Sequence, residues 1–272
     1  MKFKRKLGNL RRAVFGIMAD TLDRVPATSL SAITIGNSIK GNKIPAYKLG
    51  SGKKNILIVA GIHGNETGTV KLALNLLGWL ESGGARYKEL TFLIIPCLNP
   101  DGYTEALLHP DYLRGGTIGR FNANGVDINR NFPTPTFQSR AHWARGKNYE
   151  EHVEVYSGEK PNSEPETQAL LNLIKKEKVE FIIAFHNAGS DVIGNKVKPS
   201  EEAAKLFSET SGFRFENNDE WMKAKRTGTL KEWSEINNIG FLEIEGSSRW
   251  GSDWRRQSGA LKKVIDFLAA SD

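Results

Sequence analysis

The chain has 272 residues, a formal net charge of +7, 39% hydrophobic residues and 25% charged residues. This length fits one large α/β domain or two small ones. No apolar run approaches the roughly 18 residues of a membrane-spanning helix, so such a helix is excluded. The single cysteine, Cys97, excludes an intrachain disulfide. Its place in the apolar run 92–98 favours a buried structural thiol over a nucleophile.

The N-terminal segment combines a basic start with a short apolar run, Ala13 to Ala19, that ends at Asp20 without a clear cleavage site. We therefore expect residues 1–25 to form a basic arm and residues 26–272 to form the folded domain. The protein should then stay in the cytoplasm, and export on a weak signal is the alternative. The other basic residues are spread along the chain without a nucleic-acid motif, so no nucleic-acid partner is expected. A basic surface also suits a small acidic substrate.

In the first half of the chain, apolar runs alternate with a helical pattern. Strands are expected at Asn55–Ala60 and Thr91–Leu98. Between them, Thr67–Glu81 carries leucines at helical spacing and stops at Ser82-Gly83-Gly84. The segment from Pro100 to Pro161 is different, because it is rich in Gly, Asn and Arg and has little periodicity. A long structureless segment inside a compact domain is usually functional.

In the second half, a helix is expected to begin at Ser163, with Glu166 completing a capping box. Its buried stripe would be Leu170, Leu171, Leu173 and Ile174. The remaining elements are expected as a strand at Glu180–Phe185, a helix at Ser200–Ser211, a strand at Gly240–Ile244 and a helix at Ser258–Ala270. Strands that are apolar throughout indicate a sheet covered on both faces, and their alternation with helices indicates a doubly wound α/β domain.

Two of these strands end in residues that could bind a metal. His63 and Glu66 lie on a tight turn after the first strand, and His186 directly follows the strand Glu180–Phe185. Side chains at the carboxyl ends of neighbouring buried strands converge on one edge of a sheet. Imidazole nitrogen and carboxylate oxygen both suit Zn²⁺. The chain has five histidines, and the other three, His109, His142 and His152, lie in the irregular region.

Further polar residues could complete a site. Glu243 and Glu245 point to the same face of their strand, and either could exchange protons with a water and a leaving amine or pair with an Arg. The planar guanidinium of Arg130 can donate two hydrogen bonds to a substrate carboxylate, and Asn129 can add another donor. Arg120 is suited to stabilising a developing oxyanion.

Taken together, the chain resembles the zinc carboxypeptidase family. The motifs are HGNE at 63–66, NPDG at 99–102, GVDINRNFP at 125–133, FH at 185–186 and the strand ending at Glu245, in the family's order. Within the family it is most similar to bacterial murein peptide amidases and γ-D-glutamyl–diaminopimelate peptidases, through the segments RFNANGVDINRNFPTP, YSGEKPNSEPET and TGTLKEWSE. The resemblance implies a single domain with a mostly parallel or mixed twisted sheet of about eight strands and helices on both faces.

The resemblance also implies the role of each candidate residue. His63, Glu66 and His186 would bind one zinc ion per chain, and Glu245 would be the general base. Asn129 and Arg130 would bind the substrate's terminal carboxylate, and Arg120 would polarise the scissile carbonyl. The substrate would be a small peptide with a free carboxylate, of the murein type.

The chain departs from the family pattern at three places. Glu243 stands where the family usually has Thr, and Gly240 where the related amidases usually have Pro. The family's tyrosine over the substrate carboxylate has no clear match, although Trp221 and Trp233 lie near that region. The alternatives are a carboxypeptidase acting on ordinary peptides, a zinc deacylase of N-acyl amino acids, or a binding protein that has lost catalysis.

Overall fold

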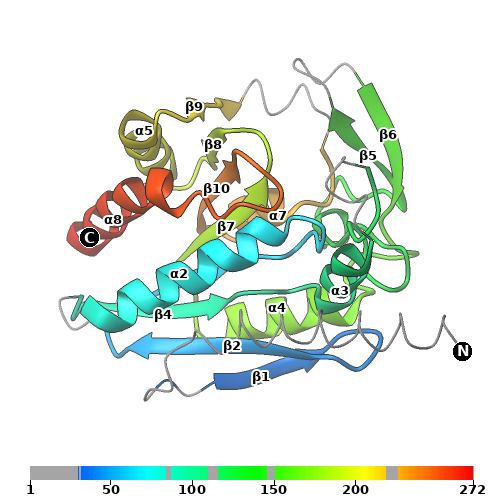
Figure 1. Ribbon diagram of the computed structural model, residues 1–272, viewed down its shortest axis with the longest axis horizontal. Coiled ribbons are helices and arrows are strands. Elements are labelled where there is room, and N and C mark those ends of the chain that lie inside the picture. Colours follow the sequence, from blue (N-terminus) through cyan, green and yellow to red (C-terminus); the bar gives the residue numbers. More distant parts are fainter. Residues whose placement is uncertain are drawn as a thin grey trace, which may run out of the picture.

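The computed structural model describes residues 30, 32–83, 87–109, 116–145, 151–218 and 226–271. Within them, eight strands form one mixed sheet in the order β1-β2-β4-β3-β7-β10-β8-β9 (Figure 1). The strands are β1 (Ala32–Asn37), β2 (Lys43–Gly50), β3 (Lys54–Val59), β4 (Leu90–Ile95), β7 (Phe181–Asn187), β8 (Asp191–Gly194), β9 (Arg214–Phe215) and β10 (Gly240–Gly246). The expected α/β domain with an eight-stranded sheet is confirmed. The predicted division at residue 25 stays a prediction, since it lies outside the described residues.

The centre of the sheet is parallel. β4, β3, β7 and β10 run in the same direction, whereas β2 and β8 pair antiparallel to β4 and β10. The four central strands are the four that the sequence predicts, within a few residues at each end. Their carboxyl ends therefore lie at one edge of the sheet, where a ligand is expected in this class of fold.

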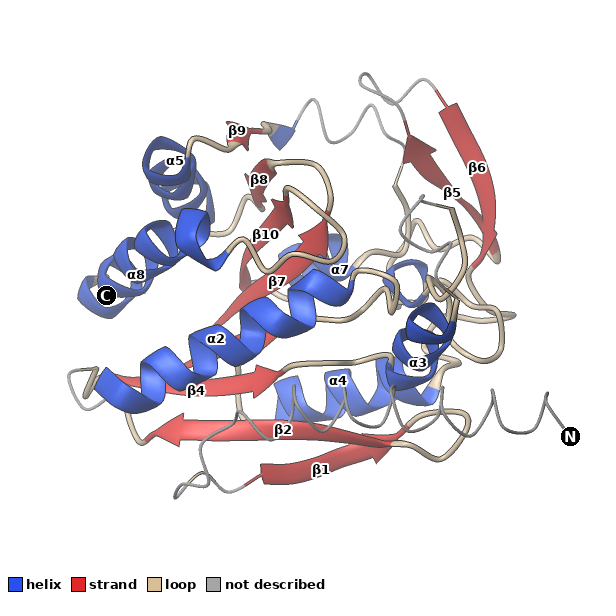
Figure 2. Ribbon diagram, viewed as in Figure 1, coloured by secondary structure: helices blue, strands red, loops and turns tan. Residues whose placement is uncertain are grey.

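Helices cover both faces of the sheet (Figure 2). They are α2 (Thr67–Gly83), α3 (Pro100–Leu108), α4 (Pro165–Lys176), α5 (Ser200–Ser211), α7 (Leu230–Ile236) and α8 (Trp254–Ala270). Side chains along a strand alternate between the faces, so Ile56 and Ile58 pack with α2, α5 and α8, and Leu57 and Val59 pack with α4 and α7. This two-sided burial explains why the strands are apolar throughout. The predicted helices α2, α4, α5 and α8 are all present.

The expected capping box at Ser163 is wrong. Glu164 occupies the N-cap position without a side-chain capping bond, and Pro165 opens α4. Proline suits this first position because a backbone N–H there would have no acceptor within the helix. The Glu166 carboxylate instead accepts hydrogen bonds from the backbone N–H of Ile39 and the amide of Asn122. It thereby links α4 to two distant loops.

The segment from Pro100 to Pro161 is more regular than its sequence suggests. It begins with α3, where the Asn99 side chain accepts a hydrogen bond from the N–H of Gly102 and Pro100 takes the first turn. It also contains a short 3-10 turn, Ile128–Arg130, and a separate hairpin of β5 (Arg140–Arg145) and β6 (Glu151–Tyr156). Of its described side chains only Ala141 and Val155 are buried, so the hairpin has few of the apolar residues that indicate a strand.

Candidate metal centre

The turn after β3 is shaped by glycine. Gly61 has a φ of +60°, and a Cβ there would lie 3.0 Å from the Cα of Cys97. A Cβ on Gly64 would lie 2.1 Å from the backbone nitrogen of Tyr103. The turn therefore packs directly against the loop that leads into α3. It aims His63 and Glu66 inward before α2 begins.

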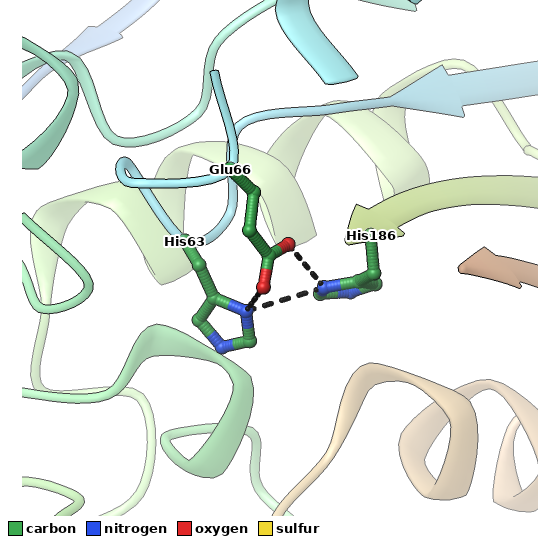
Figure 3. A group of neighbouring side chains, drawn as sticks. All are labelled: His63, Glu66 and His186. Carbon is green, nitrogen blue, oxygen red and sulfur yellow. Dashed lines mark hydrogen bonds and ion pairs between the residues drawn. The ribbon is translucent and has the colours of Figure 1, made fainter. Parts of the chain in front are cut away.

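His63, Glu66 and His186 converge in a buried cluster (Figure 3). The His63 Nδ1 atom lies 2.9 Å from Glu66 Oε1, and the His186 Nδ1 atom lies 3.1 Å from Glu66 Oε2. The two Nδ1 atoms lie 3.2 Å apart. Ligands at tetrahedral zinc are spaced by about 3.3 Å, so one ion can be reached by all three donors. Within the described residues, this is the one group of three such side chains that could hold a metal.

The electrostatics of the cluster favour a cation. Burial alone would raise the pKa of Glu66, but His63 and His186 hold it well below its usual range. Burial alone would lower the pKa of His186, but Glu66, Glu243 and Glu245 raise it to about 9. The carboxylates therefore create a negative field at the point where the three donors meet. Two histidines and one carboxylate are also a donor set of catalytic zinc sites, so the residues fit the metal.

A residue that the sequence reading missed, Asp127, supports the cluster from behind. Its Oδ1 atom lies 3.2 Å from His63 Nε2 and accepts a hydrogen bond from the backbone N–H of Asn129. Its Oδ2 atom accepts hydrogen bonds from Nε and Nη2 of Arg120, at 3.0 and 2.8 Å. Metal-binding histidines usually have such a carboxylate on the other ring nitrogen. Asp127 stands inside the GVDINRNFP motif, but spacing alone does not reveal which carboxylate meets which histidine.

Arg120 lies at the edge of the cluster. Its Nη1 atom is 4.0 Å from Glu66 Oε1, and its guanidinium carbon is 4.3 Å from the centroid of the Trp143 ring. Asp127 on one side and the aromatic ring on the other fix its orientation. The cation of Arg120 is thus close to the position where the three donors meet. Its role in stabilising an oxyanion stays a prediction.

Asn129 and Arg130 also lie near the cluster. The Asn129 Nδ2 atom is 3.5 Å from His186 Nε2, and its Oδ1 accepts a hydrogen bond from the N–H of Leu230. Arg130 donates from Nε to the carbonyl of His142 and from Nη1 to the carbonyl of Asn129. Burial lowers the pKa of Arg130 to about 10, with Asp127 acting in the opposite direction. Arg130 therefore stays cationic at neutral pH.

Glu245, rather than Glu243, is the glutamate in register with a residue of the cluster. It lies in register with His186 across the parallel pair of β7 and β10, whereas Glu243 lies in register with Ala184. Without a metal ion, burial and then the Glu66 carboxylate raise the pKa of Glu245 to about 8. A cation held by the cluster would lower this pKa again and favour the ionised carboxylate that a general base requires. Glu243 pairs instead with Arg226, at 3.9 Å between Oε1 and Nη1. This geometry separates two residues that the sequence left as alternatives.

Several other candidates lie elsewhere. His142 and His152 face each other on the β5–β6 hairpin with ring centroids 6.0 Å apart. Trp233 lines a cavity of about 1290 Å³ with Phe181 and Ile239, at the amino ends of β7 and β10. That is the opposite end of these strands from the cluster, so Trp233 does not replace the family's tyrosine. Trp221 lies outside the described residues. Cys97 as a whole residue is partly exposed, although burial of its thiol group raises the thiol pKa.

The family model for zinc carboxypeptidases matches residues 18–238. The chain belongs to the zinc carboxypeptidase family. Zinc is the metal that gives the family its name, and the His63–Glu66–His186 group can bind one such ion. In the described part of the chain, no helix is both long and apolar enough to cross a membrane.

Two curated relatives are similar to this chain in sequence. Murein peptide amidase A of Escherichia coli (strain K12) is 35% identical over 139 residues, which cover 48% of each chain. Gamma-D-glutamyl-L-diamino acid endopeptidase 1 of Lysinibacillus sphaericus is 27% identical over 214 residues, which cover 68% of this chain and 53% of that protein. The chain therefore spans about half the length of the curated relatives it matches.

A solved structure confirms the family fold. Murein-tripeptide amidase from Escherichia coli O157 matches with a TM-score of 0.66 at 22% identity, covering 91% of this chain and 95% of that one. At this identity the likeness concerns the fold alone. It extends over nearly all of both chains.

Proposed function

We propose that the protein is a zinc-dependent hydrolase that cleaves an amide bond next to a free carboxylate in small murein-type peptides. The observation that carries this proposal is the position of Glu245 in register with His186, at the edge of a His63–Glu66–His186 cluster that fits zinc. A binding protein without catalysis would have no need of a carboxylate there. The names of the two curated relatives support the peptide class.

The residues divide the reaction among them. His63, Glu66 and His186 would hold the zinc ion, which would supply a Lewis acid and make the attacking water more acidic. Glu245 accepts a proton from the attacking water and returns it to the leaving nitrogen. Arg120 donates hydrogen bonds to the carbonyl oxygen as negative charge develops on it. Arg130 and Asn129 bind the free carboxylate and so fix which amide bond is cleaved.

The test is cleavage of L-Ala-γ-D-Glu-meso-diaminopimelate by the full chain, together with its zinc content, with and without a chelator. We expect about one zinc per chain and cleavage that the chelator abolishes. Glu245→Gln should keep zinc and lower kcat by about 10²–10⁴-fold. Arg130→Ala should raise KM, whereas Arg140→Ala, on the exposed hairpin, should change nothing.

Three results would decide against parts of the proposal. Unchanged hydrolysis in Glu245→Gln and Arg130→Ala would remove both role assignments. Zinc content with cleavage of ordinary C-terminal peptides only would make the protein a general carboxypeptidase. Binding of peptide by a metal-free, inactive protein would favour a binding role. The expected cytoplasmic location stays a prediction, since residues 1–29 lie outside the described part of the chain.

A further inference from the structure

Three carboxylates share one face of the sheet beside the metal cluster. Asp191 on β8 lies directly opposite Glu245 on β10, and Glu243 precedes Glu245 by two residues. Directly opposed residues of an antiparallel pair point to the same face with Cβ atoms about 5 Å apart, and residues two apart on a strand share a face. Glu245 therefore has Glu243 and Asp191 as neighbours. Catalysis at Glu245 needs neither of them.

Two arginines interleave with these carboxylates. Arg226 Nη1 lies 3.9 Å from Glu243 Oε1, and Arg214 Nη2 lies 3.2 Å from Asp191 Oδ2. Arg226 is also within electrostatic reach of Asp191. Opposite charges thus alternate along this edge. An apolar side chain placed here would desolvate charged groups without pairing them.

The same charges extend to the proposed carboxylate-binding residue. Arg226 and Glu243 both act electrostatically on Arg130. The side chains of Arg226 and Asp191 are 16% and 13% exposed, so each retains an accessible part, whereas that of Glu243 is only 8% exposed. A substrate residue whose α-carboxylate binds Arg130 would therefore extend its side chain toward Arg226 and Asp191. Glu243 lies deeper and contacts Arg226 from within.

We propose that Asp191 and Arg226 select a substrate side chain that ends in an amino-acid group, Asp191 binding its ammonium and Arg226 its carboxylate. Glu243 is a positioning residue that orients Arg226. This inference rests on the proposed function and names the subsite that would distinguish diaminopimelate from simpler residues. It also gives a role to the glutamate that departs from the family's usual threonine.

Three peptides test the inference, each L-Ala-γ-D-Glu-X with a different last residue. X is meso-diaminopimelate, L-lysine, which lacks the distal carboxylate, or L-2-aminopimelate, which lacks the distal ammonium. The intact protein should cleave the diaminopimelate peptide with a kcat/KM at least about tenfold above either analogue, because each analogue loses one of the two charge-assisted contacts. The protein is used as the full chain with its zinc content verified.

Variants should remove one preference at a time. Arg226→Gln should abolish the preference over the lysine peptide and keep most of the preference over the aminopimelate peptide. Asp191→Asn should do the reverse. Glu243→Gln should, like Arg226→Gln, lose the preference over the lysine peptide, and the loss should appear in KM rather than in kcat. Glu243→Asp should restore part of this preference. Lys205→Gln, at an exposed pair on α5, is the matched control and should change no ratio.

The outcomes separate this inference from the proposed function. Failure of the zinc-loaded protein to cleave all three peptides would overturn the proposed function itself. Equal kcat/KM on all three would leave that function standing and overturn the inference. Should a variant fail to fold, the kcat/KM values of the unmodified protein on the three peptides still test the inference, since that comparison needs no substitution. Selectivity that survives both Arg226→Gln and Asp191→Asn in folded proteins would also overturn it.

Discussion

Asp127 links three parts of the candidate site through one carboxylate, contacting His63, Arg120 and the backbone of Asn129. Burial alone would raise the pKa of Asp127, but Arg120 and His63 hold it well below its usual range. The group is therefore ionised at neutral pH and balances the buried charge of Arg120. It fixes the orientation of both neighbours before substrate binds.

Replacing this carboxylate by an amide should weaken metal binding without removing a ligand. We expect Asp127→Asn to lower zinc affinity by about 10–100-fold, as measured by competition with a chelator of known affinity. The free energy of unfolding should fall by up to about 3–5 kcal/mol, because Arg120 loses its buried partner. Asp101→Asn is the matched control, since Asp101 is equally buried and bonded to Ser38, Lys40 and Asn42. It should lose stability but keep its zinc affinity, and equal affinities in the two variants would contradict the role of Asp127.

Cys97 provides a pH-dependent reporter of the fold. Burial is the main cause that raises the pKa of its thiol to about 12, with Asp101 adding to it and a hydrogen bond from the Asn99 backbone opposing it. At pH 8, alkylation of the native thiol should be about a thousandfold slower than that of an ordinary cysteine with a pKa near 8.5. Denaturant should restore the ordinary rate. Fast alkylation of the native protein would show that the thiol is not desolvated.

The same shift has a consequence for stability. The folded chain keeps the thiol proton that the unfolded chain releases above about pH 8.5, so this contribution to stability is complete below that pH. It is lost as pH rises from about 8.5 toward 12. Cys97→Ala should therefore flatten the alkaline decline in the free energy of unfolding. An unchanged decline would assign it to other groups.

Site residues could be predicted from the sequence where the type of side chain and its place after a strand indicate the role. Residues whose role depends on a particular contact partner could not. His63, Glu66 and His186 follow strands and have metal-binding side chains, so their convergence could be predicted from topology. Asp127 could not, because it lies in a loop before a short 3-10 turn, and no rule of sheet topology places such a loop beside His63. The distinction between Glu243 and Glu245 likewise required the register of β10 against β7.

At the scale of elements, the surroundings of Gly240 exclude the proline that the sequence analysis expects in related amidases. A Cβ at this position would lie 2.3 Å from the Phe181 ring, and the Gly240 N–H donates a hydrogen bond to the carbonyl of Glu180. Proline would add bulk against a buried ring and remove the donor. The start of β10 is therefore adapted to the phenylalanine that begins β7.

This packing predicts opposite effects of two glycine substitutions. Gly240→Ala should lower the free energy of unfolding by about 1–3 kcal/mol through overpacking against Phe181. Gly78→Ala should raise it by about 0.5–1 kcal/mol, because Gly78 lies within α2 and a Cβ there meets nothing within 4 Å. Denaturant unfolding of both variants measures the contrast. Destabilisation by Gly78→Ala, or none by Gly240→Ala, would contradict the packing described.

Elements with strong periodicity could be predicted and short or exposed ones could not. The four central strands are buried on both faces and are therefore visible in the sequence as apolar runs; they are β3, β4, β7 and β10. β9 has two residues and β8 has four, which are too few for a pattern. β1 alternates only between exposed and partly buried positions. The order of the strands followed from contacts between segments far apart in the sequence, and no local signal carries that information.

At the scale of the molecule, the candidate metal centre connects the turn after β3 to the end of β7. Glu66 and His186 lie 120 residues apart in the chain, so the unfolded chain offers no preformed site. A ligand that binds only the folded state stabilises it by an amount that depends on its concentration relative to Kd. Zinc should therefore contribute to global stability as well as to catalysis.

Removal of the metal should lower the melting temperature. At a free zinc concentration of about 100 times Kd, binding contributes about 2.7 kcal/mol, which for a chain of this size corresponds to roughly 5–10 °C. A chelator should produce this shift in a thermal scan, and added zinc should reverse it. His186→Ala should melt at a lower temperature and respond to neither reagent, because it lacks one of the three donors. A melting temperature that is insensitive to chelator, in protein shown to have lost its zinc, would place the bound metal outside the His63–Glu66–His186 cluster.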